Sequence, residues 1–149
     1  MEQIPTQEEI SQIHRIIKPY IHRTPVLANQ HINTISEASI YFKCENFQKV
    51  GAFKMRGAAS AVAALDDSLK YRGVATHSSG NHAQAVALTA KLHGIDAHIV
   101  MPENAPAIKR NAVEEYGAHV YTSGNLIQDR EAKMNEVLEA TGATFIHPY

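Results

Sequence analysis

The sequence contains a single cysteine, Cys44, among its 149 residues. One cysteine cannot form a disulfide within the chain, and a reducing compartment, the cytoplasm, is therefore the expected location. An excess of one charge is also lacking, because 14 lysines and arginines stand against 15 aspartates and glutamates, for a formal net charge of -1. A balanced chain has no broad field to attract nucleic acid or an acidic membrane. These absences favour small-molecule chemistry.

Long apolar segments and metal-binding patterns are missing as well. No segment is long and apolar enough to span a bilayer, and the start of the chain, MEQIPTQEEI, lacks the basic residues and apolar run of a signal peptide. Neither H-E-x-x-H nor a C-x-x-C pair occurs, and His77 and His82 lie five residues apart across a predicted turn. We therefore expect no membrane partner, no nucleic-acid partner and no metal site in this chain.

Glycines at a regular spacing divide the second half of the chain. Four short apolar runs each begin with a glycine, namely Gly73, Gly94, Gly117 and Gly142. The intervals of 21, 23 and 25 residues each accommodate one strand, one helix and two short turns. Helices are predicted between the strands over residues 81–93, 106–116 and 125–141. This alternation predicts an α/β fold, an open parallel sheet with helices on both faces.

The first third of the chain shows a different pattern. Thr6 and Glu9 form a T-x-x-E capping box ahead of an apolar stripe, which predicts a helix that ends near Pro19. An extended segment around Pro25 and a strand over residues 39–45 follow, with a helix predicted directly after them. The chain is predicted to divide into residues 1–66, a small α/β domain over residues 67–144, and residues 145–149 leading out of that domain.

Two stretches carry candidate chemistry. Lys54 begins an alanine-rich helix, where it either extends its stem to water or performs a task that favours a desolvated amine. Residues 78–81, Ser-Ser-Gly-Asn, come after a predicted strand and open the next helix. At the carboxyl edge of a parallel sheet, such a turn either binds an anion through free N–H groups or is an ordinary helix cap.

Taken together, FQKVGAFKMRGAASAV, THSSGNHAQAVALTAKLHG and IVMPENAPAIKRNAVEEYGA closely resemble the serine racemase and threonine dehydratase family, pyridoxal-phosphate enzymes of fold type II. In that family the lysine of F-K-x-R-G forms a Schiff base with the cofactor, which assigns this role to Lys54. The resemblance places Phe53 against the pyridine ring and Asn81 at the ring hydroxyl. It also assigns the binding of the substrate carboxylate to the loop of Ser78, Ser79, Asn81 and His82.

The resemblance implies a lyase or isomerase that acts on serine, threonine or 3-hydroxyaspartate, by β-elimination, racemisation or both. In the racemases the second serine of S-S-G-N-H works on the face opposite the lysine, so Ser79 favours racemase or hydroxyaspartate-type members. Family members form homodimers and run to about twice this length. We therefore expect an N-terminal part that is inactive alone, with any divalent-cation site outside it. A noncatalytic paralogue that binds an amino acid or a protein partner, and a purely structural domain, are the alternatives.

Overall fold

The computed structural model describes residues 4–148. Helix α1, Gln7–Ile17, begins at the predicted capping box: the Glu9 amide donates to Thr6 Oγ1 at 3.2 Å, and the Thr6 amide donates to Glu9 Oε2 at 2.7 Å. The helix ends where the 3-10 turn η1, Lys18–Tyr20, brings in Pro19. Both predicted limits of this helix are therefore confirmed.

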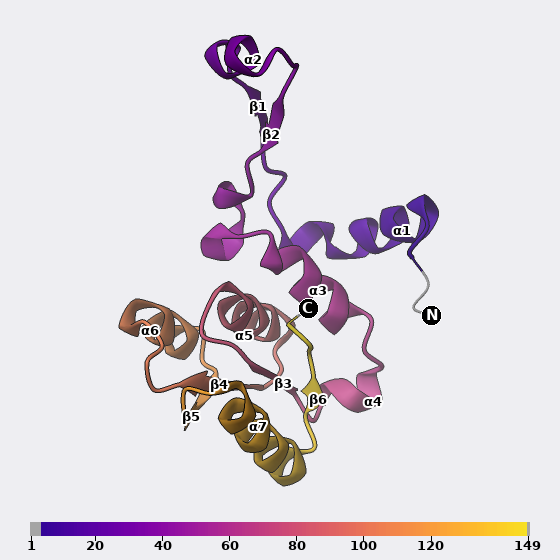
Figure 1. The fold of residues 1–149 in the computed structure, drawn as a ribbon. Coiled ribbons are helices and arrows are strands. Elements are labelled where there is room, and N and C mark those ends of the chain that lie inside the picture. The colour runs from indigo at the N-terminus through magenta and orange to yellow at the C-terminus, as the bar shows by residue number, and fades with distance from the viewer. Residues whose placement is uncertain (1–3, 149) are drawn as a thin grey trace.

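A two-stranded hairpin projects from the rest of the molecule (Figure 1). Strand β1, Val26–Ala28, pairs antiparallel with β2, Tyr41–Lys43, and helix α2, Gln30–Ser36, lies between them in the chain. Strand β2 is shorter than the strand predicted over residues 39–45. All six residues of β1 and β2 are exposed. A pair of strands with no layer packed on it has neither a partner to lengthen the ladder nor a buried face.

The helix that carries Lys54 does not follow the hairpin directly, as the sequence predicted. Two 3-10 turns intervene, η2 at Glu45–Phe47 and η3 at Lys49–Gly51, before α3 begins at Lys54 and runs to Ala63. In η3 both Val50 and Gly51 have positive φ, 56° and 64°. This conformation is unfavourable for a β-branched residue and breaks the helical run, which the sequence pattern did not reveal.

The second half of the chain forms the predicted parallel sheet. Its strand order is β5-β4-β3-β6, with all neighbours parallel, and the bounds are Val74–His77 for β3, Ala97–Pro102 for β4, His119–Ser123 for β5 and Thr144–Phe145 for β6. The connecting helices lie at Asn81–His93 for α5, Ala107–Glu115 for α6 and Ile127–Thr141 for α7, after the short helix α4 at Asp67–Lys70. The predicted range for α5 is confirmed, and α6 and α7 begin one or two residues later than predicted.

Helices cover both faces of this sheet, with α5 and α6 on one side and α7 on the other (Figure 1). The α5 face contains the larger core, in which Val74 and Ile99 of the sheet pack with Val86 of α5. Helix α3 lies over α5, and its Ala58 and Val62 belong to that same core. The alanines of the two helices allow this close approach. The predicted division near residue 66 stays a prediction, although α3 and the sheet share one core.

Candidate active site

A cleft opens at the carboxyl edge of the parallel sheet, beside the first residue of α3. It offers about 370 Å³ of space, within the range of small-molecule sites. All the residues predicted for the site lie around it: Phe53, Lys54, Ser78, Ser79, Asn81 and His82. His77, Lys109, Arg130 and Pro148 complete the lining. Segments that are distant in sequence thus meet where the topology of a parallel sheet places a ligand site.

The amine of Lys54 extends into this cleft from the start of α3. Lys54 Nζ donates to the Pro148 carbonyl oxygen at 2.5 Å and lies 5.6 Å from the centroid of the Phe53 ring. The lysine is half-buried, whereas the Phe53 ring is 62% exposed. The amine has a hydrogen-bond acceptor and an aromatic neighbour but no carboxylate partner among the described residues. Its position explains how one charged residue fits into an alanine-rich helix.

The loop that precedes α5 presents free backbone donors to the same cleft. The Ser78 amide donates to the Val100 carbonyl at 3.0 Å, which ties the loop to β4, and the Gly80 amide donates to Ser78 Oγ at 3.2 Å. Gly80 occupies the N-cap of α5 without a capping side chain. The first amides of a thirteen-residue helix therefore point outward beside Ser79 and Asn81, an arrangement that suits a carboxylate or a phosphate.

The imidazole of His82 serves the structure of the site. His82 is buried, and its Nε2 lies 3.2 Å from the carbonyl oxygen of Ile146, which can only accept, so Nε2 donates. The Thr76 hydroxyl donates to the same carbonyl at 2.8 Å. Burial lowers the pKa of His82, which favours the neutral ring. Substrate binding by His82 stays a prediction, and its backbone amide is the group available for it.

Two cationic side chains in the cleft were missed by sequence reasoning. Lys109 Nζ donates to Asn81 Oδ1 at 3.4 Å, and the Arg130 guanidinium donates to the carbonyl oxygens of Asn125 and Leu126. Both residues belong to the first turns of helices that follow β4 and β5. Because parallel strands end at one edge, basic residues in those first turns were a usable signal.

The lining fits a cofactor with an aldehyde, an aromatic ring and an anionic group. The amine of Lys54 supplies a nucleophile for the aldehyde, the exposed Phe53 ring a stacking surface, and the Asn81 amide a polar partner for a ring substituent. The cations and helix amides supply the positive potential that an anion requires. This fold and this set of side chains fit the class of proteins that bind a carbonyl cofactor through a lysine amine.

Comparison with known proteins identifies the family. The pyridoxal-phosphate dependent enzyme family matches residues 17–149, and the chain belongs to it. Serine racemase of Oryza sativa subsp. indica is 53% identical over 133 residues, which cover 89% of this chain and 39% of that protein. The beta-hydroxyaspartate dehydratase of Paracoccus denitrificans is 45% identical over 146 residues, or 98% of this chain and 46% of that protein.

Solved structures agree with this assignment. Maize serine racemase superposes with a TM-score of 0.92 at 52% identity, over 95% of this chain and 43% of that one. Serine racemase of Dictyostelium discoideum superposes with a TM-score of 0.91 at 43% identity, over 97% of this chain and 47% of that one. The chain thus spans less than half the length of the relatives it matches. The expected fold and cofactor class are confirmed.

Two features are absent from the described residues 4–148. Within that range, no helix combines the length and the apolar character needed to cross a membrane. The same residues contain no group of three or more His, Cys, Asp or Glu side chains placed to hold a metal ion.

Proposed function

We propose that this chain supplies the covalent lysine and the carboxylate-binding loop of an amino-acid lyase or racemase. The observation that carries the proposal is the single cleft lined by Lys54, Ser79 and Asn81, which come from α3 and from the turn before α5. Relatives named serine racemase, beta-hydroxyaspartate dehydratase and L-threonine dehydratase support the substrate class, a small amino acid with a β-hydroxyl group.

Each predicted residue has a physical task in this proposal. When bound, pyridoxal phosphate supplies an electron sink that stabilises the carbanion formed at the α carbon. The Lys54 amine removes the α proton. The amides at the start of α5, with Ser78 and Asn81, hold the substrate carboxylate, and the Phe53 ring limits how the cofactor ring can tilt.

The fate of the substrate depends on what happens after the α proton is removed. Loss of the β-hydroxyl leads to a keto acid and ammonia, a reaction that needs no proton donor on the second face. Return of a proton to the opposite face gives the mirror-image amino acid, and the Ser79 hydroxyl is the donor that we propose for it. Serine, threonine and 3-hydroxyaspartate are the proposed substrates.

The surroundings of the enzyme are part of the proposal. The single cysteine supports a cytoplasmic location, and the balanced charge supports a protein without nucleic-acid or membrane partners. A homodimer would cover part of the exposed apolar surface of residues 4–53.

The test combines a chemical label with two product assays. The full-length protein is loaded with pyridoxal phosphate and reduced with borohydride, and peptide mass spectrometry locates the pyridoxyl group, expected on Lys54. Keto acid and D-amino acid are then measured from serine, threonine and 3-hydroxyaspartate. A label on another lysine would overturn the assignment of Lys54. A full-length protein that takes the label at Lys54 but yields neither product would instead be a noncatalytic binder.

A further inference from the structure

A second cavity of about 400 Å³ lies under α1, away from the active-site cleft. It is lined by His14, Lys18, Ile21, His22, Arg23, Lys43 and Arg56, and shares no lining residue with the cleft. Six of these seven residues are basic and none is acidic. Because the whole chain carries a formal charge of only -1, this concentration is a local property of the cavity.

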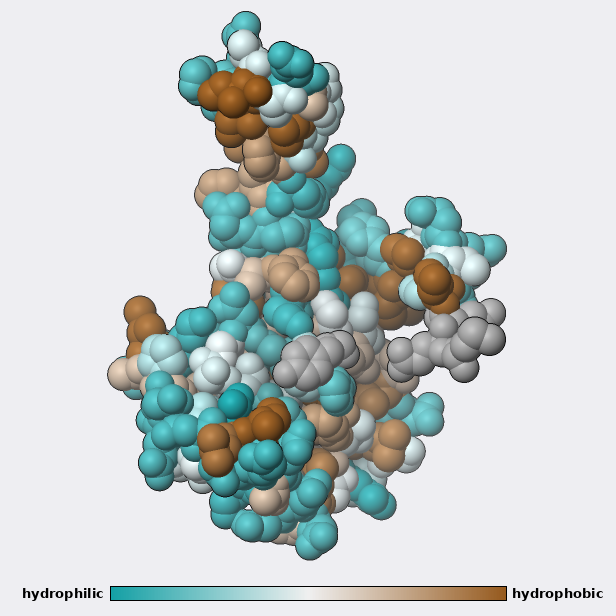
Figure 2. All heavy atoms as spheres, in the orientation of Figure 1, coloured by the Kyte–Doolittle hydropathy of each residue, from teal (hydrophilic) through white to brown (hydrophobic). Residues whose placement is uncertain are grey.

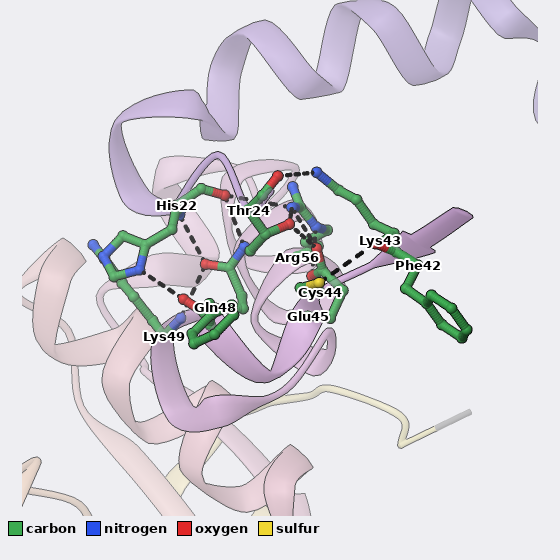
Figure 3. A network of polar contacts seen from close by, with 10 residues as sticks. His22, Thr24, Phe42, Lys43, Cys44, Glu45, Gln48, Lys49 and Arg56 are labelled. Atoms are coloured by element: carbon green, nitrogen blue, oxygen red, sulfur yellow. Dashed lines mark hydrogen bonds and ion pairs between the residues drawn. The ribbon is translucent and has the colours of Figure 1, made fainter. Parts of the chain in front are cut away.

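A network of hydrogen bonds holds several of the lining residues in place (Figure 3). The buried Gln48 side chain accepts from the His22 amide at 2.8 Å and donates to the His22 carbonyl at 2.9 Å. Lys43 Nζ donates to the Thr24 carbonyl at 2.6 Å, which holds its ammonium group beside the 22–24 segment. A binding site whose donors are already placed loses less entropy when it is occupied.

The carboxylate of Glu45 neutralises only part of the positive charge around the cavity. Glu45 makes two hydrogen bonds of 2.8 Å with Arg56, one to Nε and one to Nη2, and accepts from the Thr24 hydroxyl at 2.6 Å. Arg56 thereby lowers the pKa of Glu45 to about 2, with Lys43 adding to the effect. Glu45 is therefore ionised at neutral pH and is committed to Arg56, whose Nη1 makes none of the described hydrogen bonds.

The remaining cations have no counter-charge. In the part of the chain from residue 4 to 148, the side chains of Lys18 and Arg23 make no hydrogen bond or ion pair. Their proximity to Lys43 and Arg56 is electrostatically unfavourable unless water, salt or a ligand screens it. Cations gathered from η1, the 22–24 segment, β2 and α3 around one cavity are the donor set that an oxyanion requires.

We propose that this cavity binds an oxyanion of the phosphate class, held by Lys18, Arg23, Lys43 and the free Nη1 of Arg56. The proposal is independent of the proposed function, because Lys54 and Arg56 point to opposite sides of α3, being two residues apart on a helix. Occupation would join η1, at the end of α1, to α3 through the ligand and so stabilise the N-terminal part of the chain.

The test uses inorganic phosphate as the probe, titrated into the chain at constant ionic strength and followed by calorimetry. We expect a saturable site at this cavity with a dissociation constant on the order of millimolar or below. The double variant Lys18→Gln/Arg23→Gln should bind about tenfold more weakly or worse, because it removes two charge-assisted contacts. The matched control Arg15→Gln/Lys133→Gln removes equal charge from side chains outside the cavity and should bind as the unaltered chain does.

Two further measurements keep the outcome decisive. Lys109→Gln, which removes a cation of the cleft, should leave phosphate binding at the cavity unchanged, since loss of binding there would place the anion in the cleft and overturn the proposal. In the unaltered chain, phosphate should shift the amide NMR signals of residues 18–24 more than those of residues 78–82, a result that does not depend on any variant folding. Absence of saturable binding, or an equal loss in the control variant, would show an unspecific charge effect and contradict the site.

Discussion

Lys54 combines two tasks at one atom, because the same Nζ is the predicted attachment point for the cofactor and the predicted base. In the full-length protein, changing Lys54→Ala should therefore lower both elimination and racemisation on the order of a thousandfold or more. Keto acid and D-amino acid formation measure the loss, and circular dichroism checks that α3 still folds. Lys49→Ala, which changes a lysine outside the cleft, is the control and should keep both activities. Equal losses in the two variants would remove Lys54 from the mechanism.

Ser79 offers a test that separates the two reactions. In the proposal, its hydroxyl returns a proton to the second face, whereas α-proton removal by Lys54 does not use it. Ser79→Ala should then reduce racemisation about a hundredfold or more, the usual scale for a lost acid–base group, and reduce elimination far less. The ratio of D-serine to pyruvate formed from L-serine is the measurement. An unchanged ratio would mean that Ser79 only helps to hold the carboxylate.

Glu45 makes the largest described contribution to the pH dependence of stability. Its hydrogen bonds with Arg56 lower the pKa from the ordinary 4.5 to about 2, so the ionised form is favoured in the folded protein. A carboxyl group with a lowered pKa stabilises the fold above the unfolded value, and this stabilisation is lost as the pH falls from about 4.5 to about 2.

Glu45→Gln should consequently destabilise the protein at pH 7 by about 1–3 kcal/mol, the range for a hydrogen bond to a charged group. The variant should also lose less stability than the unaltered chain as the pH is lowered through the acid range. Urea unfolding at a series of pH values gives both quantities. Glu139→Gln, at an exposed carboxylate on α7, is the control and should follow the unaltered chain at every pH. A Glu45 variant as acid-sensitive as that control would contradict the account.

At the scale of elements, the sequence predicted a helix or strand accurately where other elements pack on it, and less accurately where it is exposed. Helix α5 was predicted residue for residue because Gly80 and Gly94 bound it and its alanines pack on both α3 and the sheet. The hairpin strands were overestimated because Ile40 and Phe42 follow a strand pattern without a covering layer. The six predicted site residues follow a local motif, whereas Lys109 and Arg130 reach the cleft only through the topology of the sheet.

The hairpin should be the least protected secondary structure of the chain. Apolar side chains gather on it and on α1 in Figure 2, and those of Val26, Leu27, Tyr41 and Phe42 are 42–71% exposed. A two-stranded ladder with no packed layer opens easily. Amides of residues 26–28 and 41–43 should exchange hydrogen on the order of a hundredfold faster than those of β4, as measured by mass spectrometry. Protection equal to that of β4 would contradict this prediction.

At the scale of the whole molecule, exposed apolar side chains are concentrated in the N-terminal third of the chain. Residues 4–53 contain eleven of the seventeen large exposed apolar side chains found among the described residues, whereas α3 and the parallel sheet bury a continuous core. The sequence predicted a division at residue 66, which would separate α3 from the sheet. A unit that combines α3 with the sheet is the alternative to test, because Val62 of α3 is fully buried among residues of α5 and the sheet. Helix α3 and the sheet should therefore unfold together.

Two valines can test this unity. Val62→Ala in α3 and Val86→Ala in α5 each remove two methyl groups from the same core and should each lower the free energy of unfolding by about 2 kcal/mol. Both variants should lower the midpoint of the same single urea transition, followed by far-ultraviolet circular dichroism. The dependence of the free energy of unfolding on urea concentration should not change. Ile108→Ala, at a side chain 78% exposed, is the control and should have little effect. If Val62→Ala instead produced a second transition, with the sheet still folded, α3 would belong to a separate unit and the division near residue 66 would be correct.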